Sequence, residues 1–131
     1  MIVAQAIAEI LKQENVEYIT AYPVNPLIDA VAAEDIRPVI VRQERTGLHM
    51  ADAGSRLSSG KKIGVFVMQN GPGSENAFGG VAQAYSESVP ILVLPAGYSR
   101  RNMGYFPNYS SSLNSRNITK HTEALTTAAA L

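Results

Sequence analysis

The chain has 131 residues, 46% of them hydrophobic, which suits a single domain with one buried core. Eleven basic side chains balance eleven acidic ones, and there is no cysteine. The composition therefore shows no electrostatic sign of a nucleic-acid or membrane-surface protein, and it excludes disulfides, thiolate metal sites and thiol catalysis.

No apolar stretch approaches the roughly 20 residues of a membrane-spanning helix. The N-terminus lacks the charged-then-apolar order of a signal peptide, because Glu9, Lys12 and Gln13 interrupt it. We therefore expect a cytoplasmic protein, which the lack of cysteine also suits, with no nucleic-acid and no membrane partner.

The distribution of apolar residues predicts helices that alternate with short strands. Apolar residues recur at helical spacing in residues 1–15, 27–33, 44–57 and from the glycine-rich turn at 71–80 to about residue 87. β-Branched and aromatic residues concentrate in residues 18–22, 37–41, 63–68 and 91–94. The last two of these strands lack polar alternation, which is typical of strands covered on both faces. We predict an α/β fold of three layers, α/β/α, around a doubly wound and mostly parallel sheet.

The C-terminal part lacks this strong periodicity. We assign residues 1–131 to one domain and predict a polar surface loop at about 98–117, either a lid or binding segment or a disordered one, because serine, arginine and aromatic residues concentrate there. Residues 118–131 have a helical, alanine-rich composition, which predicts a terminal helix. No further strand follows to complete the sheet edge, so we expect a domain truncated at its C-terminus or one part of a larger polypeptide.

Glu44 stands where a predicted strand changes into a predicted helix. The residues before it, Val39 to Val41, are β-branched, and helical spacing begins just after it. A residue at such a crossover lies at the carboxyl end of its strand, the edge at which open α/β sheets bind ligands. Glu44 is therefore the first candidate for chemistry. The alternative is an acidic residue that only stabilises the first turn of its helix.

The glycine-rich turn GPGSEN, residues 71–76, is the second candidate. A P-loop needs Lys and then Ser or Thr after its glycines, and the dinucleotide-binding fingerprint needs a third glycine where Asn76 stands, so neither pattern is complete. The turn still offers glycines that permit close backbone approach and a helix start with unpaired N–H groups beside the polar Asn76. It is either a ligand-binding turn or a tight turn that packs the helix on the sheet.

The remaining polar candidates carry no pattern of their own. His49 and His121 are far apart in sequence, and neither has a second ligand at a regular spacing. The serines at 110–112 lack the strained turn of a hydrolase nucleophile. We therefore expect no metal site and no Ser-His-acid triad in this chain.

Four segments match, in order, the motifs of a single enzyme family. The segment GPGSENAFGGVAQAYSESVPILVLPAG (71–97) is similar to GPG-x-x-N followed by G-[IV]-A-x-A-Y-x-[DE]-S-[VI]-P. AYPVNPLIDAV (21–31) is similar to a G-Y-P-G turn and helix, RQERTGLHMADAGSR (42–56) to a glutamate segment, and RNITKH (116–121) to R-S-x-T-K-W. The chain thus resembles the N-terminal, pyrimidine-binding domain of thiamine diphosphate enzymes of the acetolactate synthase and pyruvate decarboxylase superfamily.

The resemblance implies roles for five residues. In the family, a glutamate of this domain hydrogen-bonds ring nitrogen N1′ of thiamine diphosphate, and its proton favours the tautomer that deprotonates the thiazolium C2; the matching residue is Glu44. Tyr22, Pro23, Pro72 and Asn76 match positions that line the pyrimidine pocket. For these four residues the alternative is ordinary turn-building, since a proline is common at the end of a strand.

Departures from the family pattern bear on the substrate. Val24 and Asn25 replace the glycine pair after G-Y-P, and residues 43–45 read QER where acetolactate synthases have H-E-Q. The Phe-Gln pair that faces the substrate in those enzymes aligns with Phe106 and Pro107, which makes Phe106 the candidate substrate contact and removes the glutamine amide. These departures favour a less common 2-oxo acid decarboxylase, aldehyde transferase or C–C hydrolase over a housekeeping acetolactate synthase.

The resemblance also implies that this chain is not a complete enzyme. In the family, a second α/β domain holds the diphosphate and its Mg²⁺, and the active site forms between that domain and the pyrimidine domain of another subunit. We therefore expect thiamine diphosphate and Mg²⁺ as cofactors, a diphosphate-binding domain in the same or another chain, a homo- or hetero-oligomer that is at least dimeric, and a small 2-oxo acid as substrate. FAD, present in some relatives, is not indicated.

The expected activity is that of a C–C bond lyase or transferase, and only in the assembled enzyme. Two alternatives stay open. One is a non-catalytic oligomerisation or binding module of the same fold, and the other is a nucleotide-binding domain that uses the GPGSEN turn.

Overall fold

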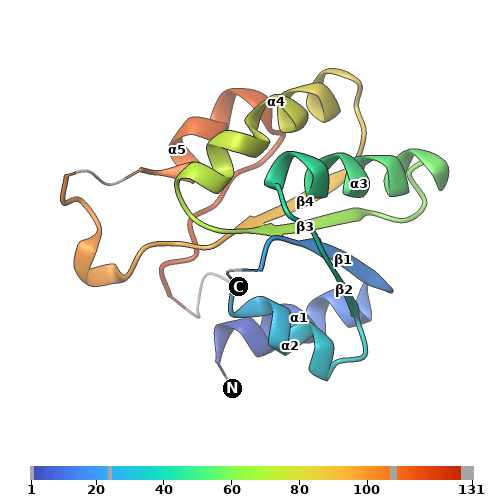
Figure 1. Cartoon of the computed structure of the whole chain (residues 1–131), viewed down its shortest axis with the longest axis horizontal. Helices are drawn as coiled ribbons and strands as arrows, with labels where there is room; N and C mark the ends of the chain where they lie inside the picture. Colours follow the sequence, from blue (N-terminus) through green and yellow to red (C-terminus); the bar gives the residue numbers. More distant parts are fainter. Residues whose placement is uncertain (1, 24, 107–108, 128–131) are drawn as a thin grey trace.

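A computed structural model describes residues 2–23, 25–106 and 109–127 of the chain. Within these residues the strands form one parallel sheet in the order β2-β1-β3-β4 (Figure 1). The strands are β1 (Tyr18–Ala21), β2 (Arg37–Ile40), β3 (Gly64–Met68) and β4 (Ile91–Pro95). Each agrees with its predicted segment to within one residue at either end.

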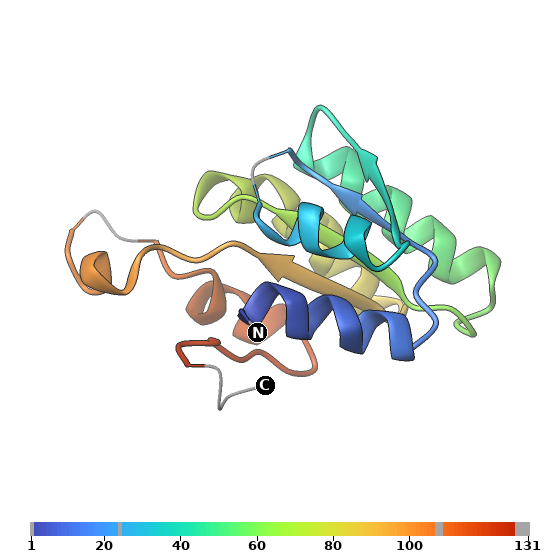
Figure 2. The same cartoon turned by 90° about the horizontal axis from the view of Figure 1, so that it is seen from below.

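Helices cover both faces of this sheet (Figures 1 and 2). They are α1 (Val3–Gln13), α2 (Leu27–Ala33), α3 (Glu44–Leu57) and α4 (Pro72–Ser86). α1 and α2 lie on one face over a core that includes Leu11, Ile19, Val31, Val65 and Val67. α3 and α4 lie on the other face over a core that includes Val41, Leu48, Phe66, Met68 and Ala77. The predicted three-layer, doubly wound α/β fold is confirmed. Among the described residues, no helix is long and apolar enough to cross a membrane.

The direction in which the chain adds strands reverses between β1 and β3. β2 pairs with one side of β1, and β3 pairs with the other side. The crossover through α2 therefore runs on one face and the crossovers through α3 and α4 on the other, as right-handed parallel connections require. The loops after β1 and β3 leave the sheet toward opposite faces. We call the carboxyl ends of these two strands the switch point, and open α/β sheets bind ligands there.

The two apolar strands differ in how well they are covered. Every residue of β3 is buried, as its continuous apolar sequence predicts. The same expectation for β4 is wrong, because its first four residues are only half-buried and Pro95 is exposed. In the described part of the chain, β4 is an edge strand that pairs with β3 alone. The continuous apolar sequence of β4 therefore does not show that this strand lies in the interior of the sheet.

Small residues allow α3 to pack closely against α4 and the sheet. A Cβ atom at Gly80 of α4 would overlap with Leu48 of α3, and a Cβ atom at Gly47 of α3 would overlap with Phe66 of β3. Thr20 of β1 also donates its hydroxyl to the carbonyl oxygen of Gly47 at 2.7 Å. These contacts fix the first turns of α3 against the sheet.

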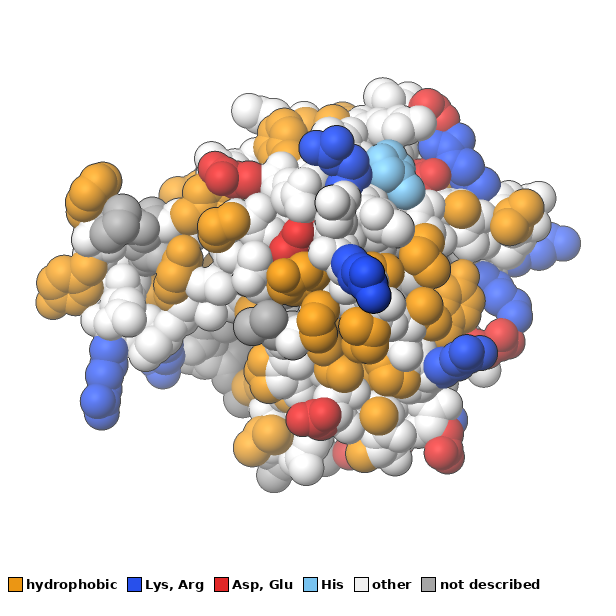
Figure 3. Space-filling view, viewed as in Figure 1, with side chains coloured by type: hydrophobic (Ala, Val, Ile, Leu, Met, Phe, Trp, Pro, Cys, Tyr) orange, Lys and Arg blue, Asp and Glu red, His pale blue; other side chains and the backbone are white. Residues whose placement is uncertain are grey.

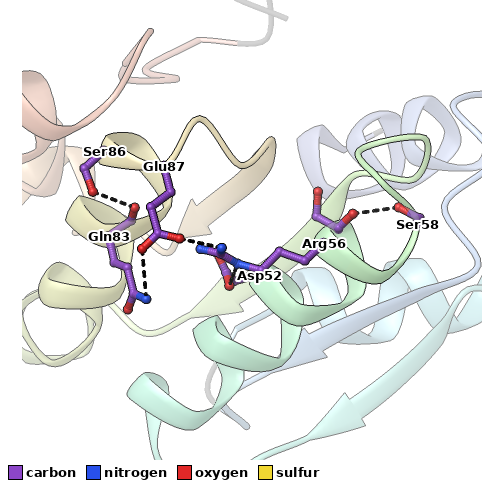
Figure 4. Close-up of polar contacts among 7 residues, drawn as sticks. Asp52, Arg56, Ser58, Gln83, Ser86 and Glu87 are labelled. Atoms are coloured by element: carbon purple, nitrogen blue, oxygen red, sulfur yellow. Dashed lines mark hydrogen bonds and ion pairs between the residues drawn. The ribbon is translucent and has the colours of Figure 1, made fainter.

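A cluster of charged side chains joins the C-terminal ends of α3 and α4 (Figure 4). Arg56 Nε lies 2.6 Å from Asp52 Oδ2, one turn earlier in α3, and Arg56 Nη1 lies 2.5 Å from Glu87 Oε2, just beyond α4. The hydrogen bonds to Asp52 and Glu87 raise the pKa of Arg56 further above its ordinary value. Arg56 therefore stays charged and neutralises the buried carboxylate of Asp52.

The segment after β4 differs from the predicted loop and terminal helix. It contains the short helices η1 (Arg100–Asn102), α5 (Ser111–Asn114) and η2 (Ser115–Ile118). No helix occurs in residues 119–127, so the predicted terminal helix is wrong for this part, and residues 128–131 lie outside the described residues. Thr119, directly after η2, has an extended backbone conformation (φ −139°, ψ 149°), so the helical turn ends there.

Two neighbouring glycines in α4 test the close contact between α3 and α4. A Cβ atom at Gly79 would meet nothing within 4 Å, whereas one at Gly80 would meet Leu48. Because alanine is the better helix former, Gly79→Ala should raise the free energy of unfolding by about 0.5–1 kcal/mol. Gly80→Ala should lower it by about 1–3 kcal/mol through overpacking. Urea denaturation measures both changes, and equal effects would show that α4 does not approach α3 in this way.

Candidate functional site

Glu44 is the first residue of α3 and lies just beyond the carboxyl end of β2. Its neighbour Arg45 is exposed, but Glu44 itself is only 5% exposed. A carboxylate that served only the dipole of its helix would gain nothing from losing contact with water. Its burial indicates that neighbouring groups or a ligand supply its polar contacts.

Asn76 of α4 supplies one of these contacts. Its Nδ2–H group donates a hydrogen bond to Glu44 Oε2 at 2.7 Å. An amide N–H group can only donate, so Oε2 is the acceptor, and a proton carried by Glu44 in this arrangement sits on Oε1. Oε1 is therefore the oxygen that could exchange a proton with a ligand.

The glycines of the GPGSEN turn leave room for this carboxyl group. Gly73 is buried in the first turn of α4, and a Cβ atom there would lie 2.6 Å from Gln69 Cγ and 3.1 Å from Glu44 Oε1. A larger residue would crowd the carboxyl group. Gly71 has φ +58°, in the left-handed region that favours glycine, and its Cβ would lie 2.7 Å from Tyr98 Oη. Close contacts with neighbouring side chains therefore explain why residues 71 and 73 of this turn are glycines.

The other residues of the predicted pocket lie at the same edge of the sheet. Tyr22 follows β1, its N–H group donates to the carbonyl oxygen of Val67 at 2.9 Å, and its half-buried side chain packs on the core beneath α3 and α4. Pro23 is exposed directly after it. Pro72 is exposed at the first position of α4, where the missing N–H group has no intrahelical partner to lose. The structure therefore brings the acid and the amide into contact and places the other three residues at the ends of β1 and β3.

Phe106, the candidate substrate contact, lies in the segment that projects beyond β4 (Figure 1), and its side chain is 98% exposed. Its neighbours Met103 and Tyr105 are exposed as well. Pro107, which occupies the glutamine position, and Val24, in the turn after β1, lie outside the described residues. The described residues therefore do not enclose Phe106 in a site of this chain.

Asn25 is the residue that the sequence analysis missed. The sequence marks it only as a departure from the family's glycine pair. In the structure its Nδ2 donates to the carbonyl oxygen of Met68, at the end of β3, at 2.9 Å. An Asn-Pro pair directly after a central strand favours a turn stabilised by the asparagine side chain, and this signal could have identified Asn25.

Elsewhere, the residues that the structure describes offer no comparable arrangement. Among the described residues, no group of three or more His, Cys, Asp or Glu side chains could hold a metal ion. His49 and His121 are exposed. A cavity of about 820 Å³ lies between α4, β4 and residues 111–125, and Glu44 is not among the residues that line it. Its lining is mostly apolar, with Phe78 and Leu92 among its members.

All but the last five residues of the sequence match a known family. A family model described as "Thiamine pyrophosphate enzyme, N-terminal TPP binding domain" covers residues 1–126. The chain belongs to this family. Thiamine pyrophosphate is another name for thiamine diphosphate, so the match confirms the resemblance found in the four motifs.

Curated relatives of this thiamine pyrophosphate-binding domain include several acetolactate synthase large subunits. The one from Haemophilus influenzae is 36% identical over 95 residues, which are 70% of this chain and 16% of that protein. The one from Buchnera aphidicola subsp. Schizaphis graminum is 33% identical over 124 residues, 90% of this chain and 21% of that protein. The one from Lactococcus lactis is 43% identical over 94 residues, 69% of this chain and 16% of that protein. The matches thus span about a fifth or less of the length of these relatives.

The residues at the carboxyl edge fit the pyrimidine end of thiamine pyrophosphate. A ring nitrogen that can gain or lose a proton suits a buried carboxyl group, and Glu44 has Oε1 free of the bond from Asn76. Gly73 packs against the carboxyl group without a side chain, since a Cβ atom there would lie 3.1 Å from Oε1. A cation that binds the diphosphate would need several oxygen ligands, and the described residues hold no such acidic cluster. The described residues therefore fit the pyrimidine ring of the cofactor, and they offer no site for the metal-bound diphosphate.

Replacement of Asn76 tests its contact with Glu44. Asn76→Ala leaves Oε2 without its donor, and we expect the free energy of unfolding to fall by about 1–3 kcal/mol at pH 7. Asn76→Asp places a second carboxylate against the first, so we expect a larger loss that shrinks toward the Asn76→Ala value as mildly acidic pH protonates the pair. Denaturation curves at several pH values measure the difference. A loss for Asn76→Asp that is smaller than for Asn76→Ala, or that does not depend on pH, would contradict the contact.

Proposed function

We propose that this domain binds the aminopyrimidine ring of thiamine diphosphate and that Glu44 shares a proton with ring nitrogen N1′. The observation that carries the proposal is the burial of Glu44 at the carboxyl edge, with Oε2 held by Asn76 and Oε1 left outside that hydrogen bond. The match to the N-terminal TPP binding domain supports the same role. Tyr22, Pro23 and Pro72 contact the ring in this proposal, because they lie at the ends of the strands beside Glu44.

Thiamine diphosphate, when bound, supplies the electron sink for making or breaking a C–C bond next to a carbonyl group. The residues of this chain position the ring and move one proton. Glu44 donates or accepts that proton through Oε1, while Asn76 keeps the carboxyl group in one orientation. Glu44 is only 5% exposed, so little bulk water reaches the acid.

We propose that the complete enzyme acts on 2-oxo acids, as a decarboxylase, an acetolactate synthase-like transferase or a C–C lyase. The names of the curated relatives, acetolactate synthase large subunits, support this substrate class. Phe106 is the proposed substrate contact in this chain, supported by its place in the segment that aligns with the substrate-facing pair of the family. Its exposure means that such a contact needs a partner to enclose it.

The partner that we propose is a diphosphate-binding domain, in the same polypeptide or another one, that holds the diphosphate through Mg²⁺. The relatives' length supports it, because about four fifths or more of each lies outside the matched segment. The enzyme is then an oligomer of at least two such units, placed in the cytoplasm, and FAD is not indicated. Positive and negative side chains are scattered over the face seen in Figure 3, and no large area of positive charge suggests nucleic acid there.

The two alternatives receive less support. A non-catalytic binding module would have no need of a buried acid held by an amide at a glycine turn, yet this arrangement is present. A nucleotide-binding domain that uses GPGSEN would need close access to Gly71, and Tyr98 Oη lies only 2.7 Å from the place of a Cβ atom on Gly71. Titration of the complete enzyme with NAD or ATP should show no binding.

Glu44→Gln tests the proposed role most simply. The amide has the same size and can still accept from Asn76, but it cannot share a proton with N1′. We expect the turnover of the complete enzyme to fall by about 10²- to 10⁴-fold, the usual contribution of a positioned proton donor, while the fold persists.

Glu75→Gln is the matched control for this measurement. Glu75 also lies in the first turn of a helix at the same edge of the sheet, but it is exposed. Its replacement should leave turnover within about twofold, in line with the small effect of exposed charges. Turnover retained in Glu44→Gln would refute the role of Glu44.

A further inference from the structure

One side chain, that of Asn25, connects three segments at the carboxyl edge of the sheet. Its Nδ2 donates to the carbonyl oxygen of Met68, the last residue of β3, at 2.9 Å, and lies 3.5 Å from the carbonyl oxygen of Leu94 in β4. Its Oδ1 accepts from the N–H group of Leu27, the first residue of α2, at 3.0 Å. Asn25 thus ties the turn after β1 to the helix that follows and to the ends of two strands.

The hydrogen bonds of Asn25 lie at the switch point, beyond the end of the backbone pairing between β1 and β3. The loops after β1 and β3 leave the sheet there toward opposite faces, so backbone hydrogen bonds between the two segments soon end. In the described part of the chain, the bond from the N–H group of Tyr22 to Val67 is the last backbone bond from the β1 segment to β3. Three residues later, Asn25 restores a connection to β3 through its side chain.

The local sequence explains why the side chain of Asn25 can accept one hydrogen bond from α2 and donate another to β3. Pro26 has no N–H group, so the first group in α2 that can donate to Asn25 Oδ1 belongs to Leu27. This bond orients the amide and points Nδ2 toward Met68. Asn25 is half-buried, so water competes only in part for these bonds.

We propose that Asn25 is a positioning residue that holds Tyr22 and Pro23 in the place where they contact the pyrimidine ring. The inference rests on the proposed function, because the ring is the ligand that this turn would meet. A glycine at this position, as in the family pattern, has no side chain for these bonds. This chain therefore fixes the turn by a contact of its own, before any cofactor binds.

Asn25→Asp separates the two halves of the contact. Aspartate keeps the oxygen that accepts from Leu27 and loses the donor to Met68, whereas Asn25→Gly loses both and serves as the second variant. Asn117→Asp, at an exposed position of η2, is the control for the same chemical change. Each variant is made in the complete enzyme. Two quantities are measured: hydrogen exchange without cofactor of the backbone amides in residues 22–27, where Pro23 and Pro26 have no N–H group, and the dissociation constant of thiamine diphosphate.

We expect exchange in residues 22–27 to rise at least tenfold in Asn25→Asp, and at the amide of Leu27 to rise further in Asn25→Gly. The dissociation constant of thiamine diphosphate should rise about tenfold in both variants, while kcat at saturating cofactor stays within about twofold, because the ring once bound meets the same acid. A merely structural residue would lower stability without this split between cofactor affinity and kcat. Asn117→Asp should change neither quantity.

Unchanged exchange in residues 22–27, or an unchanged dissociation constant, in both Asn25 variants would overturn the inference. A fall in kcat equal to the rise in the dissociation constant would overturn it as well, because Asn25 would then act on the reaction and not on the position of the turn. These failures are distinct from failure of the proposed function. In that case the parent enzyme would not bind thiamine diphosphate, or Glu44→Gln would keep its turnover.

Discussion

The arrangement at the carboxyl edge depends on one hydrogen bond, from Asn76 to the buried carboxyl group of Glu44. Each residue needs the other as its hydrogen-bond partner. Burying the carboxylate of Glu44 without a donor would cost free energy, and the amide of Asn76 needs an acceptor. The bond commits one oxygen of Glu44 and leaves the other for a ligand. It also joins the first turn of α3 to α4, so the chemistry of the site and the packing of two helices share one contact.

Other contacts of α3 and α4 hold the two helices in the positions that this hydrogen bond needs. Gly80 and Gly47 allow close packing near the site, and Thr20 holds α3 to β1 through the carbonyl group of Gly47. At the far ends of the helices, the cluster of Asp52, Arg56 and Glu87 joins them again. The two helices are thus fixed at both ends. A carboxyl group at the start of one helix can then meet an amide on the other with little loss of side-chain freedom on ligand binding.

Much of this arrangement could be predicted from the sequence, and the reasons are physical. β-Branched runs and helical spacing located the strands and main helices, and the junction after Val41 placed Glu44 at the binding edge. The sequence could not show that β4 is an edge strand, because its apolar composition is the same as that of the buried β3. It also could not show the reach of Asn25, because that depends on which backbone oxygens lie nearby in space. The family's motifs assigned Asn76 and Glu44 to one cofactor site, but only the structure shows the hydrogen bond between these distant segments.

The structure of the complete enzyme with thiamine diphosphate bound would test the central claim most directly. The account predicts that Glu44 Oε1 lies within about 2.6–3.2 Å of ring nitrogen N1′, with Asn76 still bonded to Oε2 and with Tyr22 and Pro23 against the ring. A pyrimidine ring bound away from the ends of β1 and β3, with Glu44 in contact only with protein groups or water, would contradict it.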